Sequence, residues 1–199
     1  MYIIKKTSDK IVSIKDKAWE SANVAEVNIR NWDGFEKAPK MEARLLYSDF
    51  GIHVQMVTDE NPLRATAREQ NGQICKDSCM EFFVRPNEND PRYLNIEINP
   101  FGTIYLGLRT SRYDCVYPEK GRDYLEVQSY VDNEKWILQY VIPFEFIKEI
   151  FGDYTKTMYG NLYKCGDETE SPHLASYYPV VWEKPDFHRP ECFGEFVLE

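Results

Sequence analysis

The stretch from Tyr93 to Arg109, YLNIEINPFGTIYLGLR, alternates apolar and polar side chains almost without interruption. The apolar positions are Leu94, Ile96, Ile98, Ile104, Leu106 and Leu108. Successive side chains of a strand point to opposite faces, so this period predicts two strands that are joined by a turn at Pro100–Gly102. One face belongs to a core, and the other carries amide, carboxylate, phenol and guanidinium groups.

Short alternating runs recur along the whole chain. ARLLYSDF leads through a turn at Asp49–Gly51 into GIHVQMVTD, SCMEFFVRP follows, and a hairpin turn lies at Asp132–Glu134. Strand-length runs without long intervening helices predict an all-β antiparallel β-sandwich, with two sheets of the immunoglobulin-like or jelly-roll type. PFEFIKEIFGDY, between Pro143 and Gly152, predicts one of at most two short helices. No linker divides residues 1–199, so we expect a single domain.

The net charge, the apolar runs and the cysteines argue against several classes of partner and site. A net charge of −9 without a basic run argues against nucleic acid, and no apolar run has the roughly 20 residues of a membrane span. The start, MYIIKKTSDK, lacks the order of a signal peptide, so we expect a cytoplasmic protein. The five cysteines are scattered, which favours buried thiols over a disulfide framework or a zinc motif of usual spacing.

Polar side chains from three runs could form one surface. Glu81 shares a parity with Cys79 and Phe83, the opening stretch adds Glu97, Asn99 and Arg109, and Gln128 with Tyr130 occupy the run YLEVQSYV. Planar polar groups pair well with sugar hydroxyls, and aromatic rings stack on sugar C–H faces. A solvent-facing side of a sheet is also polar, and alternation alone favours that interpretation. The scarcity of Lys, Thr and Ser on this face favours a binding surface.

Several motifs, in order, resemble those of family-9 carbohydrate-binding modules and their DOMON-like relatives. The matching pieces are LLYSDFGIHVQMVTD, KDSCMEFFVRP, YLNIEINPFG, WILQYVIPFEF, GNLYKCG and YYPVVWEKPDFHRPECFGEFVLE, which together span about Trp32 to Glu199. The resemblance implies a non-catalytic β-sandwich that holds a mono- or oligosaccharide, with a sugar ring between two tryptophans. Ile74 and Cys75 stand where the first of these tryptophans is expected.

The resemblance implies roles for individual residues. Glu81, Glu97 and Asn99 match strand positions that bond sugar hydroxyls, and Trp182 lies near the closing motif as a stacking surface. Arg109 joins the carbohydrate-binding candidates through the strand phasing alone. We name no catalytic residue and expect no cofactor beyond structural calcium, which the acidic loops at Asp59–Asn61, Asn87–Asp90 and Gly166–Glu168 could supply with oxygen ligands.

Three alternatives stay open on sequence grounds. Glu81 and Glu97 could form the acid/base pair of a glycoside-processing enzyme. A DOMON-like haem or redox module would need axial ligands, for which Met56 with His53 or His188 is the candidate set. The same polar face could also mediate dimerisation, and the sequence does not determine the oligomeric state.

Overall fold

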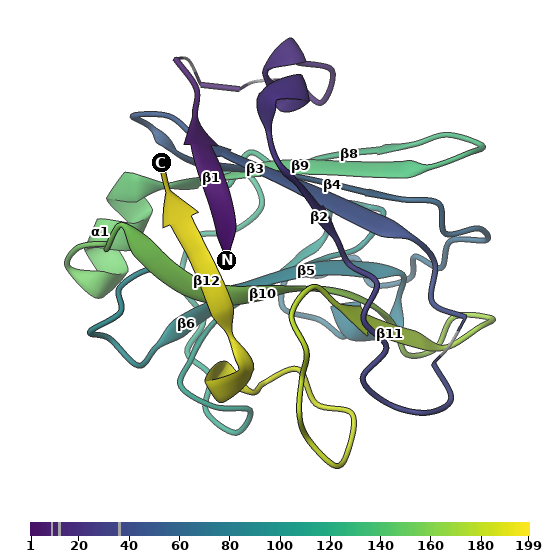
Figure 1. Ribbon diagram of the computed structural model, residues 1–199. Helices are drawn as coiled ribbons and strands as arrows, with labels where there is room; N and C mark the ends of the chain where they lie inside the picture. Colours follow the sequence, from purple (N-terminus) through teal and green to yellow (C-terminus); the bar gives the residue numbers. More distant parts are fainter. Residues whose placement is uncertain (9, 12, 36) are drawn as a thin grey trace.

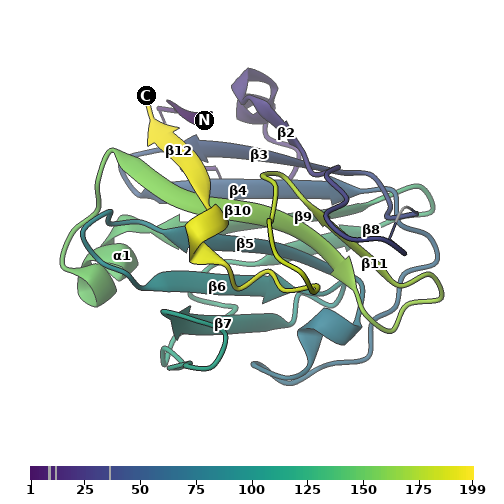
Figure 2. The same cartoon turned by 60° about the horizontal axis from the view of Figure 1, so that its bottom comes forward.

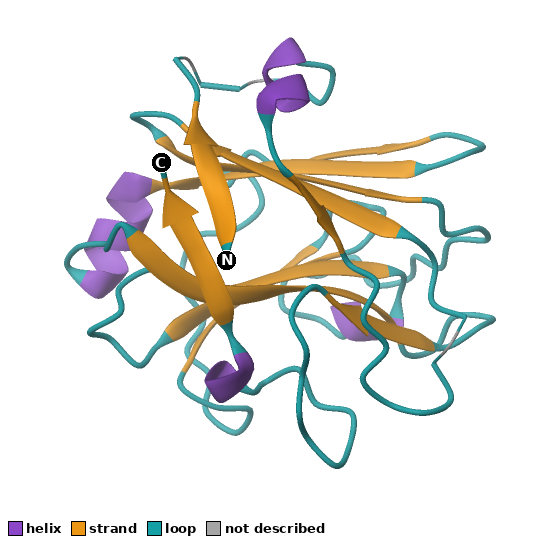
Figure 3. Cartoon of the chain, in the orientation of Figure 1, coloured by secondary structure: helices purple, strands orange, loops and turns teal. Residues whose placement is uncertain are grey.

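The computed structural model describes residues 1–199 except residues 9, 12 and 36. The described part is mostly strand, with one α-helix, α1 (Phe144–Phe151), and short 3-10 turns η1 (Lys17–Ser21), η2 (Ile74–Lys76) and η3 (Pro190–Cys192) (Figure 3). The strands are β1 (Tyr2–Lys6), β2 (Val24–Glu26), β3 (Met41–Tyr47), β4 (Gly51–Thr58), β5 (Cys79–Arg85), β6 (Tyr93–Ile98), β7 (Ile104–Arg109), β8 (Gln128–Val131), β9 (Trp136–Pro143), β10 (Thr157–Gly166), β11 (His173–Ser176) and β12 (Gly194–Leu198).

Within the described residues the strands form one connected sheet of twelve, in the order β7-β6-β5-β10-β12-β1-β3-β4-β9-β8, with β11 beside β10 and β2 beside β3. The sheet curls back on itself, so that its two halves face each other as layers (Figure 1). Strands β5, β6, β7, β10 and β12 make one half, and β3, β4, β8 and β9 make the other. Strand β1 joins them, because it pairs with β12 on one side and β3 on the other.

The main core fills the space between the two halves. Phe82 and Ile96 reach it from β5 and β6, and Val54 and Trp136 reach it from β4 and β9. All four side chains are fully buried. Burying one large apolar side chain contributes roughly 1.5–3 kcal/mol. The alternation seen in the sequence therefore fixes which side of each strand turns outward.

Each half is also covered on its outer face by a segment from one end of the chain. The segment between β11 and β12 crosses in front of β10 and β5 (Figure 2). It brings Val180 and Phe187 into a second apolar cluster with Phe83 and Tyr163. On the other half, the N-terminal segment that contains η1 packs Trp19 against Leu46.

The helix confirms its sequence signals. α1 begins directly after Pro143 and ends at Gly152, whose φ of 77° is readily adopted by glycine. In the described part of the chain, no helix has both the length and the apolar character needed to cross a membrane.

Two details of the predicted architecture are corrected by the structure. The strands form one curled, mixed sheet rather than two purely antiparallel sheets, because β1 pairs in parallel with both β12 and β3. The run that carries Gln128 and Tyr130 does not join β5 and β6, because β8 pairs with β9 in the other half. A local hairpin at Asp132–Lys135 ties β8 to β9, and this connection decides its place.

Candidate functional site

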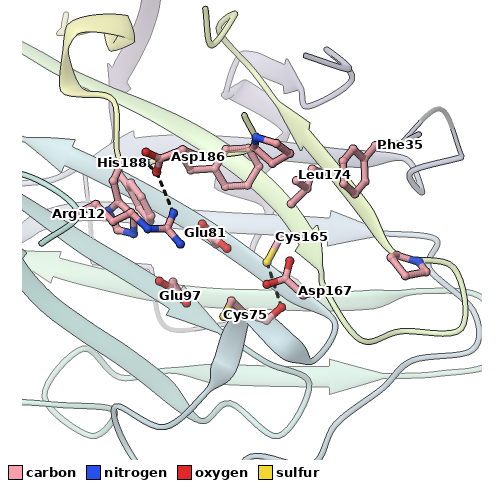
Figure 4. Close-up of a pocket in the computed structure, with 14 residues that line it drawn as sticks. Phe35, Cys75, Glu81, Glu97, Arg112, Cys165, Asp167, Leu174, Asp186 and His188 are labelled. Atoms are coloured by element: carbon pink, nitrogen blue, oxygen red, sulfur yellow. Dashed lines mark hydrogen bonds and ion pairs between the residues drawn. The ribbon is translucent and has the colours of Figure 1, made fainter. Parts of the chain in front are cut away.

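A pocket of about 410 Å³ opens on the outer face of β5, β6 and β10 (Figure 4). Glu81, Glu97 and Cys165 come from these three strands. The other residues around the pocket come mainly from loops: Phe35, Cys75, Phe83, Arg112, Asp167, Pro172, Leu174, Pro185, Asp186, Phe187 and His188. A polar floor with apolar and aromatic sides is typical of small-molecule sites.

Glu81 and Glu97 are direct partners in the antiparallel register of β5 and β6. Their side chains therefore lie next to each other on one face, with only 2% and 8% of their residue surfaces exposed. Burial, followed by the charge of Glu97, raises the pKa of Glu81 well above its usual range. Burial also raises the pKa of Glu97, to about 7. Near neutral pH the pair therefore retains a proton and can both donate and accept hydrogen bonds.

A chain of hydrogen bonds orients Glu97. Asn95 Nδ2 donates to Glu97 Oε1 at 2.9 Å, and Arg109 Nε donates to Asn95 Oδ1 at 3.0 Å. Arg109 Nη1 also donates to the carbonyl oxygens of Arg112 and Asp114, at 2.9 and 3.1 Å. Arg109 does not line the pocket, but it positions both Glu97 and the loop that carries Arg112.

Asp186 closes one side of the pocket. Its carboxylate accepts a hydrogen bond from Arg112 Nη1 at 2.9 Å and pairs with Arg189 Nη2 at 2.5 Å. Burial by itself raises the pKa of Asp186, but the hydrogen bonds from Arg112 and from the His188 backbone outweigh it and lower the pKa. The charged Asp186 therefore links the β7–β8 connection to the C-terminal segment.

Aromatic rings form the wall above the carboxyl groups. Phe187 stacks on Tyr163 with ring centroids 4.0 Å apart, and His188 stacks on Phe83 at 4.9 Å. The Tyr93 hydroxyl hydrogen-bonds His188 Nδ1 at 2.9 Å. Burial, with a smaller contribution from the Arg109 charge, lowers the pKa of His188 to about 3, so this ring is neutral. These contacts hold the His188 ring in place and thereby fix the C-terminal segment over β5 and β6.

Asn99, a predicted sugar ligand, lies outside the pocket lining. Its Nδ2 donates to the Ala67 carbonyl and to Asp77, at 2.8 and 2.9 Å. Its Oδ1 accepts from the backbone N–H groups of Phe101 and Thr103 in the turn before β7. Asn99 thus has the contacts of a turn-forming residue, and the site proposed below does not include it.

Trp182, the predicted stacking surface, also lies outside the lining. Its ring is half exposed, and the Arg189 guanidinium sits 3.5 Å from the ring centroid. The Trp182 carbonyl accepts a hydrogen bond from Trp32 Nε1 at 2.8 Å. On the opposite side, Cys75 lines the pocket where the resemblance implies the first tryptophan. The aromatic rings that line the pocket with the carboxyl groups are those of Phe35, Phe83, Phe187 and His188.

Sequence reasoning missed Arg112, Asp167, Asp186 and Phe187 as pocket residues. All four stand in irregular segments, where no periodicity assigns a direction to a side chain. One signal was present for two of them, because Asp186 and Phe187 belong to the closing motif KPDFHRP.

The structure does not bring the candidate haem ligands together. Met56 belongs to the main core, whereas His53 lies on the opposite side of the same strand and hydrogen-bonds Ser48 at 2.9 Å. A haem cannot use both as axial ligands. In the three acidic loops, Glu60, Asp90 and Glu168 each pair with a cationic side chain. Structural calcium stays a prediction.

The chain resembles the crystal structure of a proposed carbohydrate-binding protein from Bacteroides uniformis, with a TM-score of 0.82, 28% identity, and coverage of 99% of this chain and 98% of that one. It also resembles a family-9 module from Caldicellulosiruptor kristjanssonii in complex with cellotriose, at a TM-score of 0.68 and 11% identity over 100% and 93% of the chains. The same module in complex with glucose gives a TM-score of 0.67 at 11% identity, over 99% and 94%.

The curated proteins include no match to the chain. The model of carbohydrate-binding family 9 matches residues 13–198, nearly the whole sequence. The chain belongs to carbohydrate-binding family 9.

Proposed function

We propose that the chain is a non-catalytic module that binds a mono- or short oligosaccharide in the pocket above Glu81 and Glu97. The observation that carries this proposal is the register of β5 and β6, which sets two buried carboxyl groups side by side. Arg112 and the ring of Phe187 line the same pocket. Family membership and a neighbour's complexes with cellotriose and glucose support a sugar as the ligand.

The chemistry of the pocket suits a polyol. Neighbouring sugar hydroxyls both donate and accept hydrogen bonds, and a carboxyl pair that holds a proton can do the same. Arg112 supplies further N–H donors, although Asp186 already engages one of its nitrogens. Phe187, Pro185 and Leu174 offer apolar surface to the C–H side of a ring. A sugar that satisfies the buried groups would be favoured over an apolar molecule, which would leave them unpaired.

The arrangement of the two glutamates favours binding over hydrolysis. Glycosidases place their two carboxyl groups on either side of the scissile bond, roughly 5–10 Å apart. Glu81 and Glu97 instead occupy adjacent positions on neighbouring strands of one sheet face. A sugar above this face meets both groups from the same side. A screen with chromogenic glycosides tests this point, and turnover that disappears in Glu81→Gln would support the enzyme alternative.

Calorimetric titration tests the binding proposal. Glucose, xylose, galactose and cellotriose should be titrated into the wild-type chain and into Glu97→Gln, which keeps the shape but removes the acid. We expect a saturable heat with at least one sugar and about a tenfold loss of affinity in the variant, or roughly 1.4 kcal/mol. Glu42→Gln, on an exposed position of β3, is the matched control and should bind as wild type. The absence of saturable heat below about 1 mM for every sugar would contradict the proposal.

A further inference from the structure

Two cysteines that are far apart in the sequence meet under the pocket. Cys165 of β10 is the direct register partner of Cys79 of β5, and both thiols are free. Glu81 follows Cys79 by two residues and therefore points to the same side of β5. The two sulfur atoms and a carboxylate oxygen of Glu81 all lie within 4.8 Å of one another.

The three donors are held rigidly. Cys79 is completely buried, and Cys165 and Glu81 are each 2% exposed. Lys164 Nζ donates to the backbone carbonyls of Cys79 and Cys165, at 3.2 and 2.9 Å, and thereby ties the two strands together at this point. The Cys165 thiol donates to the Cys75 backbone carbonyl, with the two atoms 3.5 Å apart. The three residues therefore lie at the border between the second apolar cluster, which contains Cys79 and Cys165, and the polar floor of the pocket.

We propose that Cys79, Cys165 and Glu81 form a binding site for a thiophilic divalent cation of the Zn²⁺ class. Zinc bonds thiolate sulfur at about 2.3 Å in a tetrahedral arrangement, which separates neighbouring ligand atoms by roughly 3.8 Å. Donors within 4.8 Å of one another reach this spacing with side-chain adjustments alone. Two sulfur ligands select zinc or cadmium over the hard ions calcium and magnesium, which prefer oxygen.

The pocket gives the ion an entry route and an open coordination position. Cys165 and Glu81 line the pocket, and the Cys79 sulfur lies within 4.8 Å of their ligand atoms. Glu97 and Cys75 line the same pocket, so a fourth ligand can come from either of them or from a bound molecule. Three protein ligands beside an accessible cavity are the arrangement that zinc proteins use when the metal takes part in binding.

The ion must displace protons to bind. Burial raises the pKa of Cys79 to about 12, so in the absence of metal the thiol holds its proton. Metal binding releases the thiol protons, as in other cysteine sites.

This inference does not rest on the proposed function, because the metal can be measured without any sugar. Reduced, chelator-treated protein should be titrated with Zn²⁺ against a chromophoric chelator and, separately, with Co²⁺. We expect one Zn²⁺ per chain and, with Co²⁺, a near-ultraviolet charge-transfer band that requires thiolate ligation. Carboxylates or histidines on the surface cannot produce that band.

Single-ligand variants locate the site. Cys165→Ser, Cys79→Ser and Glu81→Gln should each weaken zinc binding at least about tenfold. The two cysteine variants should also diminish the cobalt band. Cys192→Ser, the same substitution in η3 and outside the pocket lining, is the matched control and should leave both signals unchanged. Circular dichroism confirms that each variant is folded, and Glu81→Gln keeps the test decisive if a cysteine variant is not.

Two results would overturn the metal proposal. One is a wild-type chain that takes up no stoichiometric zinc or gives no cobalt–thiolate band. The other is zinc affinity that survives in all three ligand variants. In either case a sugar titration that still shows saturable heat would leave the binding function intact, so the two proposals fail separately.

Discussion

The outer faces of the two halves of the sheet carry similar polar side chains but are covered in different ways. The covered face, which comprises Leu46, His53, Gln55 and Gln139 on β3, β4 and β9, lies under the N-terminal segment. There Gln55 Nε2 donates to the Ile14 carbonyl at 2.9 Å, and Trp19 Nε1 donates to Gln139 Oε1 at 3.3 Å. The pocket face, which comprises Cys79, Glu81, Phe83, Glu97 and Cys165, lies under the C-terminal segment.

The difference lies in what the two covering segments offer. The N-terminal segment supplies polar partners to the groups beneath it. In the C-terminal segment, Asp186 forms ion pairs with Arg112 and Arg189. Pro185 and Phe187 of the same segment line the pocket. Glu81 and Glu97 therefore face the open pocket, instead of backbone groups that would take up their hydrogen bonds. Polar residues on a strand face become a binding site only when the segment above them leaves their hydrogen-bonding capacity free.

Trp19→Ala should cause the largest loss of stability, and this loss should come from the covered face alone. Trp19 is 5% exposed and packs on Leu46, so its truncation should lower the free energy of unfolding by about 3–5 kcal/mol. Urea denaturation followed by circular dichroism measures this change. Sugar affinity of the folded variant should equal that of wild type, whereas Phe187→Ala, its counterpart on the pocket face, should lose affinity. Loss of sugar binding in folded Trp19→Ala would break the comparison.

Lowering the pH should reduce the free energy of unfolding, because His53 on the covered face is buried in its neutral form. Burial, with a contribution from the Lys10 charge, lowers the pKa of His53 to about 4 from the usual 6.5. Below pH 6.5, His53 therefore binds a proton in the unfolded chain but stays neutral in the folded chain. The free energy of unfolding consequently falls as the pH drops from 6.5 toward 4. Between pH 7 and pH 5 the contribution is about 2 kcal/mol. Denaturation curves of His53→Gln should show a smaller loss over this range, and an equal loss would contradict the assignment.

Arg109→Gln should have a moderate effect on the pocket face. The substitution removes the guanidinium that holds Asn95 and, through it, the carboxyl group of Glu97. We expect sugar affinity to fall about fivefold, or roughly 1 kcal/mol, as measured by calorimetry. Arg44→Gln, which removes an exposed ion pair with Glu42 on β3, is the matched control and should bind as wild type. Equal affinity in the two variants would show that Glu97 needs no such support.

Trp182→Ala should have the smallest effect. The ring is 48% exposed, does not line the pocket, and contacts the Arg189 guanidinium. We expect unfolding free energy and binding free energy to change by less than about 0.5 kcal/mol each. A large loss of sugar affinity on calorimetric titration would instead restore Trp182 as a stacking surface, as the sequence resemblance implies.

The sequence predicted those parts of the molecule in which local periodicity determines direction. Alternation placed Glu81 and Glu97 on one face of neighbouring strands, and the register of β5 and β6 confirms it. Pro143 and Gly152 bounded the helix for the same local reason. The family resemblance is confirmed by the match over residues 13–198.

Features that depend on distant segments could not be predicted in this way. Arg112 and Phe187 reach the pocket from irregular segments, and Asn99 was diverted into a turn by backbone donors only a few residues away. The five cysteines are scattered in the sequence, whereas the structure makes Cys79 the register partner of Cys165 on another strand. Apart from local hairpins, no pattern in the sequence encodes which strands of a sheet become neighbours.

The position of β1 between β12 and β3 has a consequence for how the fold assembles. Tyr2 and Ile3 pair with Phe196 and Val197, so this contact joins strands that are very far apart in the sequence. Bringing such distant segments together has a large loop-closure entropy, and contacts of this kind form slowly. The seam that joins the two layers is therefore expected to close after the local hairpins have formed.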